Sequence, residues 1–111
     1  MRIILVSAGP PARRLVLDSL PAMIGRDVGA EVCIEDSWVG RYQCIIDREG
    51  DTLRVLDLGS RVGTFVNGVR IQRATLRPGD MLTLGRIDFL VQCEHEEPAS
   101  TSRTIASATD K

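Results

Sequence analysis

Several residue types that carry common chemistries are scarce in this chain of 111 residues. Aromatic residues make up 4% of the sequence, and His95 is its single histidine. A Ser/His/Asp catalytic set would depend on that one histidine, and the sequence has neither a P-loop nor a Gly-x-Gly-x-x-Gly run. We therefore expect a protein that is not an enzyme and that needs no cofactor or metal.

Charge and hydropathy argue against two further classes of protein. The formal net charge is -1, although all but one of the 14 basic residues are arginine. The strongly basic balance that is typical of nucleic-acid-binding domains is therefore missing. No stretch approaches the roughly 20 apolar residues that a membrane span needs. We expect neither a nucleic acid nor a membrane among the partners.

The cysteines are few and their spacing is uninformative. Cys33, Cys44 and Cys93 are odd in number, form no Cys-x-x-Cys pair and sit among apolar residues. Buried free thiols in a reducing cytoplasm are the simplest expectation. A Cys33–Cys44 bridge has little support.

The chain is instead rich in short apolar stretches separated by glycine, proline and acidic residues. We expect strands at 3–6, 14–18, 22–26, 32–34, 43–48, 52–57, 64–66, 69–71, 81–84 and 87–93. No stretch sustains the 3.6-residue apolar period of a helix. The pattern predicts an all-β fold, an antiparallel β-sandwich of about ten or eleven short strands. Trp38, the only tryptophan, is expected in its core, and the alternative is an exposed anchor for a partner.

The composition changes after Cys93. Residues 98–111 are mostly alanine, serine and threonine, and Ile105 is their only large apolar residue. Such a segment cannot bury enough surface to offset its ordering entropy. We therefore divide the chain into a sandwich domain, 1–94, and a flexible tail, 95–111. If phosphorylated, the tail could dock in the protein's own pocket or in that of a second copy, although an inert tail is the simpler expectation.

The most informative segment is 57–68, which packs three glycines, two hydroxyl side chains and an Asn-Gly pair into one short run. Asn-Gly between apolar residues is the strongest short signal for a hairpin. Upstream lie the pair Gly25-Arg26 and the segment 38–44, which contains Arg41.

These three motifs, in this order, resemble the forkhead-associated (FHA) domain, a phosphothreonine-peptide binder with a β-sandwich fold. The resemblance covers roughly residues 1–94. The matching positions are Gly25, Arg26, Arg41, Asp57, Ser60, Gly63, Thr64, Asn67 and Gly68. The sequence departs from the family pattern at Gly40, where the family has serine, at Gln43, where it has histidine, and at Val62, where it has asparagine.

The resemblance implies a phosphate site on the loops at one end of the sandwich. A phosphate monoester carries roughly -1.5 to -2 charge and binds fixed donors such as arginine forks and backbone N–H groups. The expected phosphopeptide-binding residues are Arg26, Arg41, Ser60, Arg61 and Gly40. The residues expected to shape the loops are Gly25, Gln43, Asp57, Gly63, Thr64, Asn67 and Gly68. For Arg26 the alternative is a surface ion pair with Asp27 or Glu31, and for Arg41 and Arg61 it is a solvated position.

The departures leave two functions open. Gly40 lacks a hydroxyl whose bond to a charged oxygen is worth about 1.5–3 kcal/mol, or roughly ten- to a hundredfold in affinity. Val62 cannot bind a peptide backbone through its side chain. The chain is therefore expected to be a cytoplasmic adaptor module that binds a phosphothreonine segment of a partner protein. The alternative is a degenerate FHA scaffold that binds a partner, or a second copy, without phosphate.

Overall fold

The computed structural model describes residues 2–94, so the expected tail at 95–111 lies outside the described residues. Eleven strands follow one another along the chain: β1 (Arg2–Ser7), β2 (Arg13–Leu17), β3 (Ala22–Gly25), β4 (Val32–Cys33), β5 (Cys44–Glu49), β6 (Thr52–Asp57), β7 (Thr64–Val66), β8 (Val69–Ile71), β9 (Arg73–Leu76), β10 (Met81–Leu84) and β11 (Ile87–Glu94). No helix among these residues is long and apolar enough to cross a membrane.

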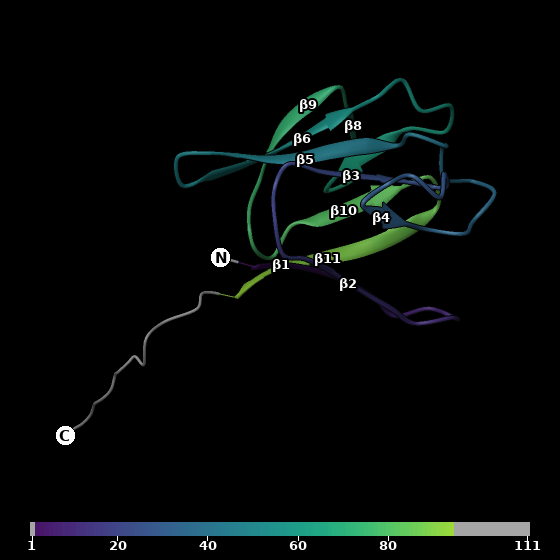
Figure 1. Ribbon diagram of the computed structural model, residues 1–111, viewed down its shortest axis with the longest axis horizontal. Helices are drawn as coiled ribbons and strands as arrows, with labels where there is room; N and C mark the ends of the chain where they lie inside the picture. The colour runs from purple at the N-terminus through teal and green to yellow at the C-terminus, as the bar shows by residue number, and fades with distance from the viewer. Residues whose placement is uncertain (1, 95–111) are drawn as a thin grey trace.

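The strands form two sheets that pack face to face (Figure 1). The six-stranded sheet has the order β2-β1-β11-β10-β7-β8, and the five-stranded sheet has the order β4-β3-β5-β6-β9. All pairs given a register are antiparallel except β3 with β4, which is parallel. The expected β-sandwich is confirmed, with one parallel pair at the edge of the smaller sheet.

The core lies between the sheets, where alternate side chains of the long strands point inwards and are apolar. In β11 the side chains of Ile87, Phe89 and Val91 are buried, whereas their neighbours are exposed. Ile24 and Ile46 face them from the smaller sheet and are fully buried. Burial of each such side chain contributes about 1.5–3 kcal/mol to folding.

The sequence pattern missed β9, and the reason is physical. Only Ala74 and Leu76 of this strand face the core, while Arg73 and Thr75 face outwards. Because β9 is the edge of its sheet and follows β8 after a single residue, it lacks both the apolar content and the turn signal of its neighbours.

The cysteines are all free, so the structure contains no Cys33–Cys44 bridge. The expectation that all three are buried is wrong: Cys44 is buried, Cys93 is half-buried and Cys33 is exposed. Cys33 lies at the end of the two-residue edge strand β4, where no further strand covers it.

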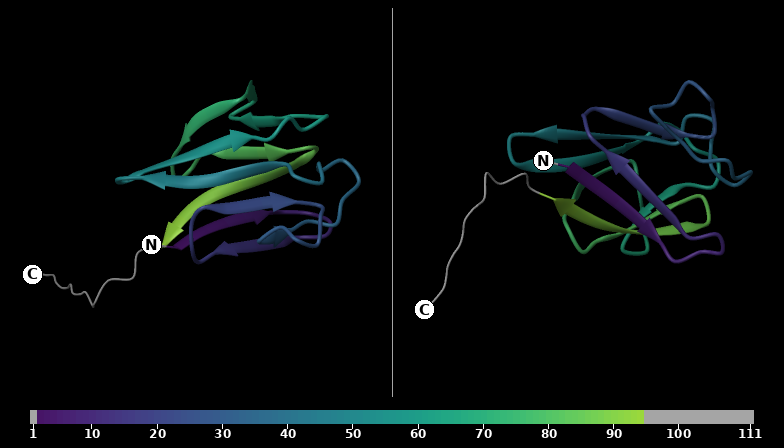
Figure 2. Two further views of the ribbon diagram at one scale, coloured as in Figure 1. Left: turned by 45° about the horizontal axis from the view of Figure 1, so that its top comes forward. Right: turned by 60° about the horizontal axis from the view of Figure 1, so that its bottom comes forward.

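Loops from both sheets gather at one end of the sandwich, opposite the start of β1 and the end of β11 (Figures 1 and 2). The three loops that carry the motifs are 26–31 after β3, 34–43 after β4 and 58–63 after β6. The rigid sheets therefore bring the three sequence motifs together.

Candidate functional site

Backbone hydrogen bonds fasten the first two loops to each other. The N–H of Arg26 donates to the carbonyl of Gly40 at 2.9 Å, and the N–H of Asp27 donates to the carbonyl of Arg41 at 3.1 Å. This approach depends on Gly25, because a Cβ there would collide with the carbonyl oxygen of Arg41. Gly25 is thus required by the close contact between β3 and the Arg41 loop.

A pocket of about 320 Å³ opens between the loops. Its lining residues are Arg26, Ser37, Trp38, Val39, Gly40, Arg61 and Val62. All three loops that carry the sequence motifs therefore contribute to one pocket, and two of the three expected arginines lie in it. We call this the loop pocket.

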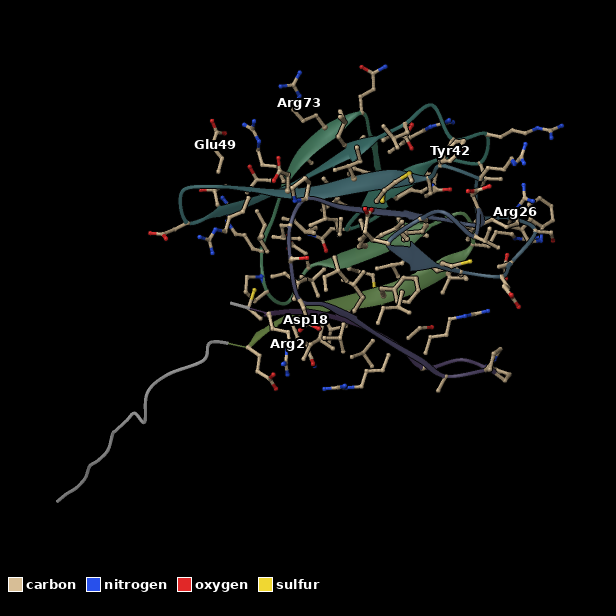
Figure 3. The ribbon with its side chains drawn as sticks, viewed as in Figure 1. Arg2, Asp18, Arg26, Tyr42, Glu49 and Arg73 are labelled. Carbon is tan, nitrogen blue, oxygen red and sulfur yellow. The ribbon has the colours of Figure 1, made fainter. Side chains whose placement is uncertain are left out.

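Arg26 is held in the loop pocket by a neutral group. Its Nε–H donates to the carbonyl oxygen of Val39 at 3.1 Å, which fixes the guanidinium and leaves its terminal nitrogens for other partners. Within residues 2–94, no carboxylate lies within 4.0 Å of this guanidinium. The surface ion pair with Asp27 or Glu31 is therefore not formed. Figure 3 shows Arg26 at the loop end of the molecule.

The other two arginines differ from each other. Arg61 is exposed, lines the loop pocket and has no carboxylate within 4.0 Å in the part of the chain that the structure describes. Arg41 lies outside the lining, is 69% exposed at its side chain and lies 3.9 Å from the Asp27 carboxylate. The positive charge of the pocket thus comes from Arg26 and Arg61.

Gly40 offers the pocket neither a hydroxyl nor its N–H group. The N–H donates to Oε1 of Gln43 at 2.7 Å. Gly40 is one of the residues expected to bind the phosphopeptide, and its N–H is already occupied in this structure. Among the described residues, the backbone N–H groups of Arg41, Arg61 and Val62 have no acceptor, and they remain as donors on the loops.

Gln43 stands at the family's histidine position and joins two loops from below. Its side chain is fully buried. Besides accepting from Gly40, its Nε2 donates to the carbonyl of Gly63 and to Oγ1 of Thr64, both at 2.9 Å. An amide both donates and accepts, so this one side chain satisfies polar groups of two loops.

Asp57 organises the third loop. Its Oδ1 accepts from the hydroxyls of Ser60 and Thr64, and its Oδ2 accepts from the N–H groups of Gly59 and Ser60. Partial burial raises the pKa of this carboxyl, but the four hydrogen bonds outweigh it, and the net pKa is lowered. The carboxylate is consequently favoured over the protonated form when the protein is folded.

Ser60 uses both of its donors inside this network. Its hydroxyl and its N–H each donate to Asp57, and the residue is 8% exposed. In this structure Ser60 therefore shapes the loop and has no free proton for a ligand.

Cys44 lies beneath this loop. Its burial, and after that the charge of Asp57, raises the pKa of the Cys44 thiol to about 12.

Asn67 and Gly68 make the hairpin turn between β7 and β8 with φ of 51° and 84°. Asn67 has a second task, since its Oδ1 accepts from the N–H of Met81 at 2.9 Å and its Nδ2 donates to Asp80 at 3.0 Å. This turn lies outside the lining of the loop pocket. It orders β7 and β10 against each other.

Trp38 is not a core residue, and that expectation is wrong. It is 49% exposed and lines the loop pocket, with the Arg86 guanidinium 4.5 Å from its ring centroid. The polar residues Asp36 and Ser37 before it place it in a loop, and the N–H of Trp38 donates to the Asp36 side chain at 2.9 Å. Those flanking turn residues were the sequence signal against a core position. The Trp38–Arg86 pair is the part of the site that the motifs did not indicate.

Among residues 2–94 no group of three histidine, cysteine or acidic side chains could hold a metal ion. The chemistry available at the loop pocket is thus anion binding by arginine and N–H donors, beside the apolar surface of Trp38 and Val62.

Comparisons with known proteins agree with this arrangement. The profile of the FHA domain matches residues 22–85, more than half of the chain. The glycogen accumulation regulator GarA of Mycolicibacterium smegmatis is 30% identical over 103 residues, which cover 90% of this chain and 65% of that protein. The oxoglutarate dehydrogenase inhibitor of Corynebacterium jeikeium is 32% identical over 85 residues, which cover 76% of this chain and 59% of that protein.

A solved structure from a structural and functional analysis of phosphothreonine-dependent FHA domain interactions has the same fold. It superposes with a TM-score of 0.77 at 27% identity and covers 86% of this chain and all of that chain. This chain spans less than two thirds of the length of the two relatives above.

Proposed function

Since this chain belongs to the FHA domain family, we propose that its loop pocket binds a phosphothreonine-containing segment of a partner protein. In this proposal the chain is a non-catalytic adaptor module. A cytoplasmic location, expected from the unpaired thiols, belongs to the same proposal.

The observation that carries the proposal is the unneutralised charge of the loop pocket. Arg26 and Arg61 line one cavity, and Arg26 is oriented by a carbonyl instead of a carboxylate. Two guanidinium groups without acidic partners repel each other, and a doubly charged phosphate relieves that repulsion while it accepts their N–H donors. The free N–H groups of Arg41, Arg61 and Val62 supply further donors.

The roles of the expected residues follow from this geometry. Arg26 would hold the phosphate as a fork, Arg61 would add charge from the opposite rim, and Arg41 would contribute its N–H while its side chain exchanges Asp27 for an acidic group of the ligand. Gly40 and Ser60 would shape the pocket without donating to the ligand. The relative whose interactions are described as phosphothreonine-dependent supports the choice of ligand.

A second function is favoured by a different observation. Gly40 and Val62 replace two polar positions of the family pattern, and together with Trp38 and Val39 they give the loop pocket a largely apolar wall. Such a pocket suits an apolar side chain of an unphosphorylated partner. This would be the degenerate scaffold.

Binding to paired peptide libraries, one with phosphothreonine and one with threonine, separates the two functions. The proposal predicts phosphate-dependent binding by the wild type, its loss in Arg26→Ala and its retention in Arg73→Ala, since Arg73 is an exposed arginine on the outer face of β9 (Figure 3). Equal binding to both libraries by the wild type and by Arg26→Ala would reject the phosphate and favour the degenerate scaffold.

A further inference from the structure

The outer face of the six-stranded sheet carries a diagonal row of apolar side chains. Side chains that lie directly opposite each other on paired strands share a face. The register pairs Val16 with Ile4, Val6 with Leu90 and Leu90 with Met81. Phe65 of β7 continues the series one step diagonally from Met81. The sheet stripe is therefore Val16, Ile4, Val6, Leu90, Met81 and Phe65.

The stripe runs diagonally from the outer edge strand β2 to β7, across most of the sheet. Leu90 is 36% exposed and Met81 is 38% exposed at its middle, Val6, Val16 and Phe65 are half-buried, and Ile4 is buried at 4% exposure. Neighbouring exposed apolar side chains such as Leu90 and Met81 mark a candidate site of protein contact. The outer face of the smaller sheet carries a shorter apolar row, Met23, Ile45 and Leu56, which spans three strands.

Two charged side chains flank the stripe on one side. Arg14 lies opposite Val6 at the β2 edge, and Asp88 lies in β11 two residues before Leu90. Neither forms an ion pair with any residue in the range 2–94, and Asp88 accepts only the hydroxyl of Thr83, at 2.6 Å. Strands lie about 4.8 Å apart and rise about 3.4 Å per residue, so the Cα atoms of Arg14 and Asp88 are roughly 12 Å apart. Both lie at the same distance from the long direction of the stripe.

This arrangement complements itself. Consider a two-fold axis that lies in the plane of the sheet face and runs perpendicular to the stripe. Rotation about this axis places the stripe of a second copy against that of the first, in the opposite direction. The same rotation brings Arg14 of each copy opposite Asp88 of the other, and the strands of the two sheets then cross at a steep angle, as in orthogonal sheet packing. We propose that the protein forms a two-fold homodimer through the sheet stripe, closed by two Arg14–Asp88 ion pairs.

The dimer leaves the loop pocket open in both copies. The stripe lies on a sheet face, whereas the pocket lies at the end of the sandwich where Arg26 is seen (Figure 3). The proposal does not depend on what the pocket binds. If the pocket takes a phosphothreonine segment, the dimer presents two such pockets and gains affinity for a doubly modified partner through avidity.

Sedimentation equilibrium of the full chain over a wide range of concentrations tests the proposal. We expect a monomer–dimer equilibrium for the wild type, and a monomer for Leu90→Asp, because a carboxylate in the middle of the stripe must be desolvated in the dimer. The matched control is Leu56→Asp, an equally simple change at a residue 41% exposed on the other sheet, which should leave the equilibrium unchanged. Circular dichroism checks that each variant is folded.

A charge exchange tests the geometry without touching the apolar residues. Arg14→Asp or Asp88→Arg alone should weaken the dimer about tenfold, since the axis repeats each mismatched pair twice. The double variant Arg14→Asp with Asp88→Arg should restore most of that loss. A wild type that stays monomeric at the highest concentration overturns the proposal, as does a dimer that is sensitive to Leu56→Asp and not to Leu90→Asp. Absence of restoration in the double variant overturns the proposed axis. None of these results bears on phosphothreonine binding, which is measured separately.

Discussion

At the scale of single residues, position 40 is where the pocket differs most from the family pattern. A Cβ at Gly40 would lie 3.2 Å from Oε1 of Gln43 and 3.6 Å from Cβ of Ser60, so a small side chain fits after a slight shift. The site therefore has room for the hydroxyl of a serine at position 40. Glycine in its place removes one hydrogen-bond donor and leaves the loop backbone unchanged.

We predict that Gly40→Ser strengthens phosphopeptide binding by roughly ten- to a hundredfold, the worth of one hydrogen bond to a charged oxygen. Gly40→Ala adds the Cβ without the hydroxyl and serves as the control, with an affinity close to that of the wild type. Calorimetric titration with one phosphothreonine peptide measures all three proteins. Equal affinities for the serine and alanine variants would mean that no phosphate oxygen lies beside position 40.

The three thiols should react in the order of their exposure. Burial raises the pKa of Cys93 as well as that of Cys44, whereas Cys33 is exposed at the end of β4. We predict that iodoacetamide modifies Cys33 first, Cys93 more slowly and Cys44 only after unfolding, because the thiolate is the reactive form. Peptide mapping by mass spectrometry follows each site. Rapid labelling of Cys44 in the folded protein would contradict its placement in the core.

At the scale of elements, the loops owe their shape to two polar side chains, the buried Gln43 and the half-buried Asp57. Gln43 forms hydrogen bonds with Gly40 of the 34–43 loop and with Gly63 just before β7. Asp57, at the end of β6, accepts hydrogen bonds from the 58–63 loop and from Thr64. Thr64 touches both, since its hydroxyl accepts from Gln43 and donates to Asp57. The two loops are thereby one hydrogen-bonded unit.

Gln43→Leu should lower the free energy of unfolding by roughly 2–4 kcal/mol, because it removes three hydrogen bonds of a buried amide and leaves the N–H of Gly40 without its acceptor. Gln72→Leu, at an exposed position, is the matched control and should change stability little. Urea denaturation measures both variants. If Gln43→Leu were as stable as the control, the loops would be held by contacts other than this amide.

The lowered pKa of Asp57 predicts a pH dependence of stability. A carboxyl whose folded pKa lies below its unfolded value, about 3.9, stabilises the fold fully above that value and loses its contribution as the pH falls through the folded pKa. The unfolding free energy of the wild type should therefore exceed that of Asp57→Asn by a constant amount from neutral pH to about pH 4, and the gap should narrow below it. Denaturation of both proteins from neutral to acidic pH gives the comparison. A gap that stays constant down to the most acid conditions would contradict the bonded carboxylate.

At the scale of the whole molecule, the sequence predicted most of the strands because local signals mark where each strand begins and ends along the chain. Alternating apolar residues and Gly or Asn turns located ten of the eleven strands, and the hairpin 64–71 was predicted with its observed strand bounds. The edge strand β9 and the exposed Trp38 were missed, because both depend on what the rest of the chain covers. Local sequence does not contain that information.

The candidate site was predictable only as a set of loops. The motifs identified Arg26 and Arg61, but the sequence could not show that Val39 orients Arg26, that Asp57 occupies both donors of Ser60 or that Gln43 occupies the N–H of Gly40. The Arg26–Val39 contact joins residues 13 positions apart, whereas the other two join residues three positions apart and depend on loop conformations that the motifs do not specify. These contacts decide which donors remain for a ligand.

The most direct test of the account is a titration of the isotope-labelled protein with a capped phosphothreonine amino acid, followed by amide chemical shifts. This probe needs no knowledge of the partner. We predict saturable shifts confined to the loop pocket, at Arg26, Trp38, Gly40, Arg61 and Val62, and to the neighbouring Arg41, and none with capped threonine. The same titration on Arg26→Ala should give no saturable shift. Shifts that are absent, or that appear equally with threonine, would contradict a phosphate site at this end of the sandwich.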